Sequence, residues 1–261
     1  MDLQLKGKSA LVVASSQGLG KAIAEQLVRE GANVMLTSRH ADKLRAVQEE
    51  LAPLGTGTVS YHPCDITKAG EIQQLVETTV QQFGTIDILI NNSGGPKPGT
   101  FEQLADEDWY NAFELNVLSC IRLIRAALPA LRMQGGRIVN VASSSVKEPI
   151  PGLLLSNTFR VALTGLTKTL AAELASSGIL INTAAPGRIS TDRVAFLDAA
   201  AAEKQGISAA EVQAAYESII PLGRYGEPQE FAKVVLFLAS AMNTYMTGST
   251  FLVDGGMVKS L

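Results

Sequence analysis

Side chains able to act on a ligand are concentrated between residues 138 and 191. Three serines, Ser143 to Ser145, directly follow an apolar run, and Ser156 and Arg160 lie four residues apart in a helical pattern. Residues at this spacing share one face of a helix. A serine hydroxyl can donate a hydrogen bond to a substrate oxygen, and a guanidinium can stabilise negative charge. Ser143, Ser156 and Arg160 are therefore the first candidates for a catalytic site.

Two apolar runs enclose these residues. Residues 138–141 end in the serines, a helical pattern covers residues 156–176, and residues 179–184 end in Pro186-Gly187. Strand, helix and strand in this order form a crossover unit of a parallel sheet. Such sheets bind ligands at the carboxyl ends of their strands. We therefore expect both polar endings at one edge of the sheet.

The same alternation continues along all 261 residues. We expect further strands over residues 9–14, 33–37, 58–62, 86–90 and 250–254. We expect further helices over residues 21–30, 41–54, 68–83, 106–133, 195–217 and 227–240. This pattern predicts an α/β fold with a doubly wound parallel sheet of the Rossmann type, in a single domain over residues 1–261. The mixed segment 188–226 would flank the substrate mouth as a loop or lid.

Bulk composition excludes several classes of function. A hydrophobic content of 46% fits a large core, and a net charge of −3 gives no reason to expect nucleic acid or a membrane as partner. No signal-peptide core and no apolar run of the ~20 residues needed to cross a bilayer are visible, so we expect a cytoplasmic protein. Cys64 and Cys120 match no metal spacing, so we expect no metal site and two buried thiols.

The first strand runs into a glycine turn that could bind a dinucleotide. Glycine at positions 18 and 20 would let the backbone approach a pyrophosphate, and the following helix would point free N–H groups at it. Turns use glycine for other reasons too, but the place of this one, after the first strand, favours nucleotide binding. The expected contacts are Ser15, Ser16, Gln17, Gly18, Leu19 and Gly20.

Several motifs in register resemble the short-chain dehydrogenase/reductase family, and most closely its β-ketoacyl-acyl-carrier-protein reductases. The motifs are Asn91-Asn92-Ser93-Gly94, Asn116 within Leu115-Asn116-Val117, the run from Pro186 to Thr191, and Asp254-Gly255-Gly256. The resemblance covers nearly the whole chain. It implies further cofactor contacts from Asp65, Ile66, Asn92, Ser93, Gly94, Pro186, Gly187, Ile189 and Thr191.

The resemblance also implies a catalytic machinery, from which this chain departs. The family uses a tyrosine with a lysine four residues later, and the matching positions here hold Ser156 and Arg160. Ser143 matches the serine that polarises the substrate carbonyl, and Asn116 matches the asparagine of the proton relay. Arg160 would hold the nicotinamide ribose and stabilise the oxyanion, but a serine hydroxyl is far less acidic than a phenol. Replacements for the missing acid could come from Ser144, Ser145, Lys147 or Tyr225.

A second departure lies in the first turn, where Val13 and Ala14 stand in place of the family's threonine and first glycine. Ala14 must then make the turn without the conformational freedom of glycine.

The residues after the second strand bear on the choice of cofactor. An acidic residue there would favour NAD(H), whereas an arginine can bind a 2′-phosphate. The chain has Ser38 and then Arg39. We therefore expect NADP(H), with NAD(H) as the alternative if Arg39 is only a solvated surface residue.

These observations predict an NADPH-linked oxidoreductase that reduces a carbonyl group of a small, 3-oxoacyl-like substrate. The first alternative is a catalytically silent dinucleotide-binding protein that works as a sensor or as the partner subunit of an active homologue. The second is a non-redox enzyme such as a lyase. In the family two long helices build a dimer or tetramer, and the small residues of segment 162–177 would let helices approach closely. We therefore expect a homotetramer or a homodimer.

Overall fold

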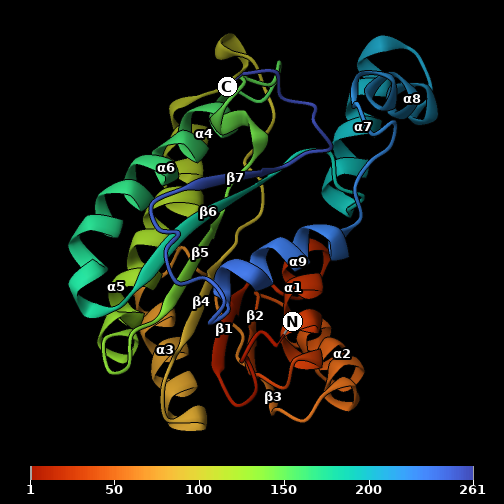
Figure 1. Ribbon diagram of the computed structural model, residues 1–261. Coiled ribbons are helices and arrows are strands. Elements are labelled where there is room, and N and C mark those ends of the chain that lie inside the picture. Colours follow the sequence, from red (N-terminus) through yellow and green to blue (C-terminus); the bar gives the residue numbers. More distant parts are fainter. Residues whose placement is uncertain (1, 261) are drawn as a thin grey trace.

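A seven-stranded parallel sheet forms the centre of the computed structural model, which describes residues 2–260 (Figure 1). The strand order is β3-β2-β1-β4-β5-β6-β7, and each neighbouring pair is parallel. The strands are β1 (Ser9–Val13), β2 (Asn33–Thr37), β3 (Val59–Tyr61), β4 (Ile88–Asn91), β5 (Arg137–Val141), β6 (Leu180–Pro186) and β7 (Thr250–Val253). The order reverses between β1 and β4, which confirms the predicted doubly wound α/β fold and places a ligand crevice at that point.

Helices cover both faces of the sheet (Figure 1). One face carries α1 (Gly18–Arg29), α2 (Ala41–Leu51) and α9 (Pro228–Ala239), and the other carries α3 (Ala69–Phe83), α5 (Ser119–Leu131) and α6 (Leu154–Leu174). Each strand interior is buried because apolar residues of both faces pack against these helices. The sheet is thus a rigid frame that fixes where each strand ends.

Two segments that were predicted to be helical are helical but subdivided. In the segment 106–133, a π-helical turn over Glu114–Leu118 joins α4 (Asp106–Phe113) to α5. The segment 195–217 consists of two helices, α7 (Asp192–Gln205) and α8 (Ala209–Ile219). Gly206 ends α7 in the left-handed region at φ 68°, and Ser208 caps α8 together with Glu211.

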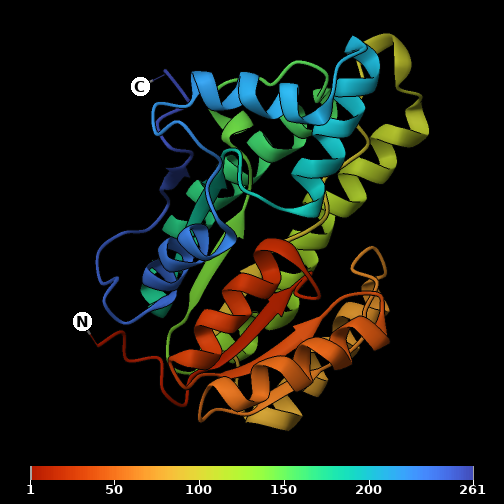
Figure 2. The same cartoon turned by 90° about the vertical axis from the view of Figure 1, so that its right-hand side faces the viewer.

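Helices α7 and α8 project beyond the sheet on the side where β6 ends (Figure 1). The view in Figure 2 shows the same segment leaning over the edge of the sheet. They follow β6 through the turn over residues 187–191. This position brings the segment beside the strand ends at which a ligand would bind.

Both thiols are buried, as expected: Cys64 is 2% exposed and Cys120 is 5% exposed. Burial raises the pKa of each thiol to about 12, so both stay protonated near neutral pH. Within residues 2–260, none of the helices combines the length and the apolar character needed to cross a membrane.

Candidate active site

A cleft of about 790 Å³ lies at the carboxyl ends of the central strands. Every residue predicted for the site lines it, except Ser15, Gly20 and Asn116. The predicted residues brought together are Ser16, Gln17, Gly18, Leu19, Ser38, Arg39, Asp65, Ile66, Asn92, Ser93, Gly94, Ser143, Ser156, Arg160, Pro186, Gly187, Ile189 and Thr191. Segments that are far apart in the chain therefore meet because parallel strands end at one edge.

The glycine turn between β1 and α1 forms one end of the cleft. Ala14 has φ 51°, the left-handed conformation that the sequence required of it. A Cβ at Gly20 would lie 2.2 Å from the Ala14 carbonyl oxygen, so only glycine fits there. Gln17 precedes α1 without a side-chain cap, which leaves the first N–H groups of the helix facing the cleft. The turn therefore has the free backbone N–H groups that an anion would need.

Two of the residues absent from the cleft wall support it from behind. The Thr37 N–H donates to the Ser15 hydroxyl at 2.9 Å, which ties the end of β1 to the end of β2. Gly20 permits the close approach of α1 to the turn described above. Both residues shape the turn rather than line the cleft.

Basic residues gather where β2 ends. Arg39, His40 and Lys43 line this part of the cleft, and the Lys43 ammonium donates to the Gln17 side chain at 3.3 Å. Sequence reasoning identified only Arg39. Lys43 could have been found because it lies in the first turn of the helix that follows the strand.

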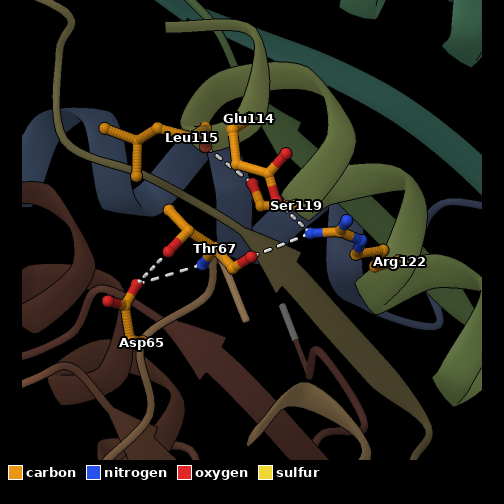
Figure 3. A network of polar contacts seen from close by, with 6 residues as sticks. All are labelled: Asp65, Thr67, Glu114, Leu115, Ser119 and Arg122. Carbon is orange, nitrogen blue, oxygen red and sulfur yellow. Dashed lines mark hydrogen bonds and ion pairs between the residues drawn. The ribbon is translucent and has the colours of Figure 1, made fainter. Parts of the chain in front are cut away.

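Asp65 lines the cleft after β3 and belongs to a polar network (Figure 3). Burial alone would raise the pKa of its carboxyl, but hydrogen bonds from the Thr67 N–H and hydroxyl outweigh this, and the pKa is lowered. The Thr67 carbonyl accepts a hydrogen bond at 2.8 Å from Arg122, which also pairs with Glu114. The network connects the Asp65 loop to the π-helical turn.

Asn116 lies in the π-helical turn, behind the cleft wall. Its side-chain amide donates to the Ser93 hydroxyl and to the Gly94 carbonyl, each at 2.8 Å. Its Oδ1 atom is buried without a hydrogen-bond partner among the described residues. π-Helical turns inside α-helices are often found at functional sites, and here the turn directs Asn116 at the loop that follows β4.

Ser143 and Ser156 reach the cleft from β5 and α6. The Ser143 hydroxyl accepts a hydrogen bond from the Ser145 N–H at 3.2 Å, which leaves its own proton free to point at a ligand. Ser156 is 9% exposed and lines the same cleft. The two hydroxyls therefore come from neighbouring elements of the predicted crossover unit.

Arg160 is a buried cation that is bound to backbone carbonyls. Its guanidinium donates to the carbonyls of Val141 at 2.9 Å, Ser93 at 3.3 Å and Gly94 at 3.4 Å. Burial lowers the pKa of this guanidinium to about 10, and the charge of Arg193 acts in the same direction. Arg160 remains positively charged near neutral pH.

Of the four residues that could replace the missing acid, only Ser144 lines the cleft. The Tyr225 hydroxyl donates to the buried Asp198 at 3.0 Å, and Tyr225 does not line the cleft. None of the other four tyrosines of the chain lines it either. Lys147 is exposed and Ser145 is buried, both outside the cleft wall, whereas Ser144 lines it.

The far end of the cleft has residues that sequence reasoning did not identify. An apolar wall is formed by Ile150, Leu153, Val194, Leu197 and Met257. Arg193, next to Val194 in α7, also lines the cleft and donates to the Pro96 carbonyl at 2.6 Å. Such loop and terminal residues carry no local pattern that would predict their contact with the cleft.

Comparison with known proteins agrees with this arrangement. Residues 13–258 match the family model described as enoyl-(acyl carrier protein) reductase. The chain is 35% identical to 3-oxoacyl-[acyl-carrier-protein] reductase FabG of Aquifex aeolicus over 98% of this chain and 100% of that protein.

Solved structures give the same result. L-sorbose reductase from Gluconobacter frateurii, complexed with NADPH and L-sorbose, superposes with a TM-score of 0.95 at 33% identity, over 100% of both chains. A short-chain dehydrogenase/reductase from Serratia marcescens superposes with a TM-score of 0.86 at 32% identity, over 97% of this chain and 98% of that one.

Proposed function

The chain belongs to the short-chain dehydrogenase/reductase family, and we propose that it is an NADP(H)-linked oxidoreductase that reduces a carbonyl group of a small or acyl-chain substrate. The observation that carries the proposal is the continuous cleft. One half offers a helix terminus and cations for a dinucleotide, and the other offers the hydroxyls of Ser143 and Ser156 beside the charge of Arg160. The reductases similar to this chain support the reaction class.

The dinucleotide half fits the cofactor on structural grounds. The uncapped N-terminus of α1 would bind the pyrophosphate, because its free N–H groups face the cleft. Arg39 and Lys43 would bind the 2′-phosphate, and Asp65 would meet the adenine. The turn over Pro186, Gly187, Ile189 and Thr191 would hold the nicotinamide end. When bound, NADPH supplies the hydride.

The other half would stabilise the charge that develops on the substrate oxygen. Ser143 and Ser156 would donate hydrogen bonds to that oxygen, and Arg160 would add a fixed, buried positive charge. Arg160 does not release a proton near neutral pH. We propose that Ser156 and Arg160 replace the family's tyrosine and lysine and that the proton comes from water, which predicts slow turnover.

The experiment that tests the function is titration with NADPH and NADH, followed by assays with 3-oxoacyl thioesters and diketones. Ser143→Ala should lower turnover by ~100- to 1,000-fold, the usual effect of removing an oxyanion donor, while cofactor affinity stays unchanged. Ser145→Ala is the matched control, because Ser145 lies in the same loop but outside the cleft wall. Cofactor binding with no turnover of any carbonyl compound would instead support the silent-binder alternative.

The choice of NADP(H) has its own test. Removing Arg39 and Lys43 together should weaken NADPH binding by roughly 10- to 100-fold, since each loses a charged contact with phosphate, and should leave NADH binding unchanged. Arg45→Ala is the control on the same helix, because Arg45 is exposed and outside the cleft wall. Equal losses for both cofactors would contradict 2′-phosphate binding.

A further inference from the structure

Arg193 is a cation of the cleft that has no acidic partner among residues 2–260. It lies in the first turn of α7, and its Nη2 atom donates to the Pro96 carbonyl, a neutral acceptor. No aspartate or glutamate within residues 2–260 forms an ion pair with it. A guanidinium has five N–H donors, and the hydrogen bond to Pro96 uses one of them. Most of its capacity to bind an anion is therefore unused.

A second guanidinium without an acidic partner in the described part of the chain lies near the first. Arg160 and Arg193 both line the cleft, and both donate to carbonyls of the short segment 93–96 that follows β4. Burial lowers the pKa of both side chains, which reflects the cost of removing positive charge from water without a counter-ion. Two uncompensated cations at one end of a cleft favour an anionic ligand there.

The acidic residues of the cleft do not supply this counter-charge. Asp65 accepts hydrogen bonds from Thr67, and Glu114 pairs with Arg122. Asp192 is exposed and forms no ion pair with Arg193. The positive charge at this end therefore faces the ligand space.

The surroundings of Arg193 distinguish a substrate from the cofactor. The phosphates of a dinucleotide already have the α1 terminus and the cations after β2 as donors. Leu197 lies one helical turn beyond Arg193 on α7, and Leu197, Ile150 and Met257 give the cleft that Arg193 lines apolar side chains that suit a carbon chain. We propose that Arg193 binds an anionic group of the substrate and that the substrate is a short oxo acid rather than a neutral ketone. This proposal rests on the proposed reductase function.

The test compares acids with their neutral counterparts. The probes are 3-oxobutanoate and 4-oxopentanoate, each against its methyl ester, with the wild type, Arg193→Met and Arg193→Lys. We expect the wild type to prefer the acids, and Arg193→Met to lower kcat/KM for the acids by about 10- to 100-fold while the esters change little. Arg193→Lys should recover part of the loss, and NADPH affinity should not change. Arg132→Met, at an exposed arginine outside the cleft, is the control.

A binding measurement separates this proposal from the proposed function. Calorimetric titration of the NADP⁺-saturated protein with the same acids and esters needs no turnover. Tighter binding of the acids that disappears in Arg193→Met would support the anion site even if no probe were reduced. Equal binding of acids and esters, or an equal loss for both in Arg193→Met, would overturn the proposal. A weaker affinity for NADPH in Arg193→Met would also overturn it, because Arg193 would then be a cofactor contact.

Discussion

Arg160 combines burial, positive charge and neutral partners in a way that stability alone does not explain. It is 6% exposed and donates only to backbone carbonyls among the described residues. A buried cation without an anionic partner is costly, because carbonyl dipoles replace only part of its hydration. Methionine in its place would bury no charge, and lysine would bury the same charge with fewer N–H donors. We interpret this guanidinium as a functional group of the cleft.

The pair Ser156 and Arg160 gives the first residue-scale prediction. Ser156→Tyr together with Arg160→Lys would introduce a phenol whose pKa a nearby cation can lower. General acid catalysis typically contributes ~100- to 10,000-fold, so turnover of a carbonyl substrate should rise within that range in the double variant. Steady-state assays with NADPH measure it, and Ser156→Tyr alone shows how much the lysine adds. A folded, NADPH-binding double variant that is no faster than the wild type would count against the assigned roles.

Ala14 gives a second prediction at this scale. An L-residue in the left-handed region costs roughly 1–2 kcal/mol. Glycine avoids this cost, but it loses more conformational entropy on folding, so only part of the cost is recovered as stability. Ala14→Gly should therefore raise the melting temperature by about 1–4 °C, given a net gain near ~1 kcal/mol in a domain of this size.

The neighbouring glycine provides the control for Ala14. Gly20→Ala should unfold or strongly destabilise the protein, since the new Cβ would lie 2.2 Å from the Ala14 carbonyl oxygen. Thermal denaturation followed by circular dichroism compares both variants with the wild type. A lower melting temperature for Ala14→Gly would show that the turn is not strained.

At the scale of elements, a cluster of side chains connects α7 and α8 to the turn that follows β6. Arg188, in the turn after β6, pairs with Asp198 of α7 at 2.5 Å and stacks on the Tyr216 ring of α8 at 3.4 Å from its centre. The Tyr225 hydroxyl completes the cluster at 3.0 Å from Asp198. We propose that segment 188–226 is a lid over the substrate end and that this cluster holds it in place.

The lid proposal predicts that Asp198→Asn loosens α7 and α8 without unfolding the sheet. Breaking a buried ion pair from one side typically costs ~3–5 kcal/mol, because the remaining charge loses its partner. Proteolytic cleavage and hydrogen exchange should therefore accelerate within residues 192–219, while the protection of the strands stays unchanged. Glu203→Gln removes an exposed acid of the same helix and should have no effect. Unchanged protection of α7 and α8 in Asp198→Asn would argue that other contacts hold the lid.

The sequence predicts where strands end better than it predicts irregular turns and long-range contacts. The ends of β5 and β6 could be predicted because apolar runs end at polar residues, and parallel strands bring those ends together. The π-helical turn at Asn116 could not be predicted, since its residues continue the helical pattern on both sides. Arg193 and Met257 reach the cleft through the folding of a lid and a terminal segment, which no local periodicity specifies.

For the whole molecule, the outer face of α6 indicates how copies would associate. Its exposed positions include Val161, Ala162, Gly165 and Thr169, which are small or apolar. Phe113 of α4 adds an apolar side chain that is 41% exposed. Small residues let helices of two copies approach closely, and burial of this face would remove apolar surface from water. We therefore expect a dimer or tetramer that uses α6.

Gly165→Arg tests this association without disturbing the fold. A Cβ at Gly165 meets no atom within 4 Å, and arginine is a better helix former than glycine by up to ~1 kcal/mol, so the single chain should tolerate the change. A bulky cation there should prevent close approach, and light scattering after gel filtration should give a smaller mass than for the wild type. Gly70→Arg, at an equally open position on α3, should keep the wild-type mass. A monomeric wild type, or a Gly165→Arg variant with the wild-type mass, would show that α6 does not form the interface.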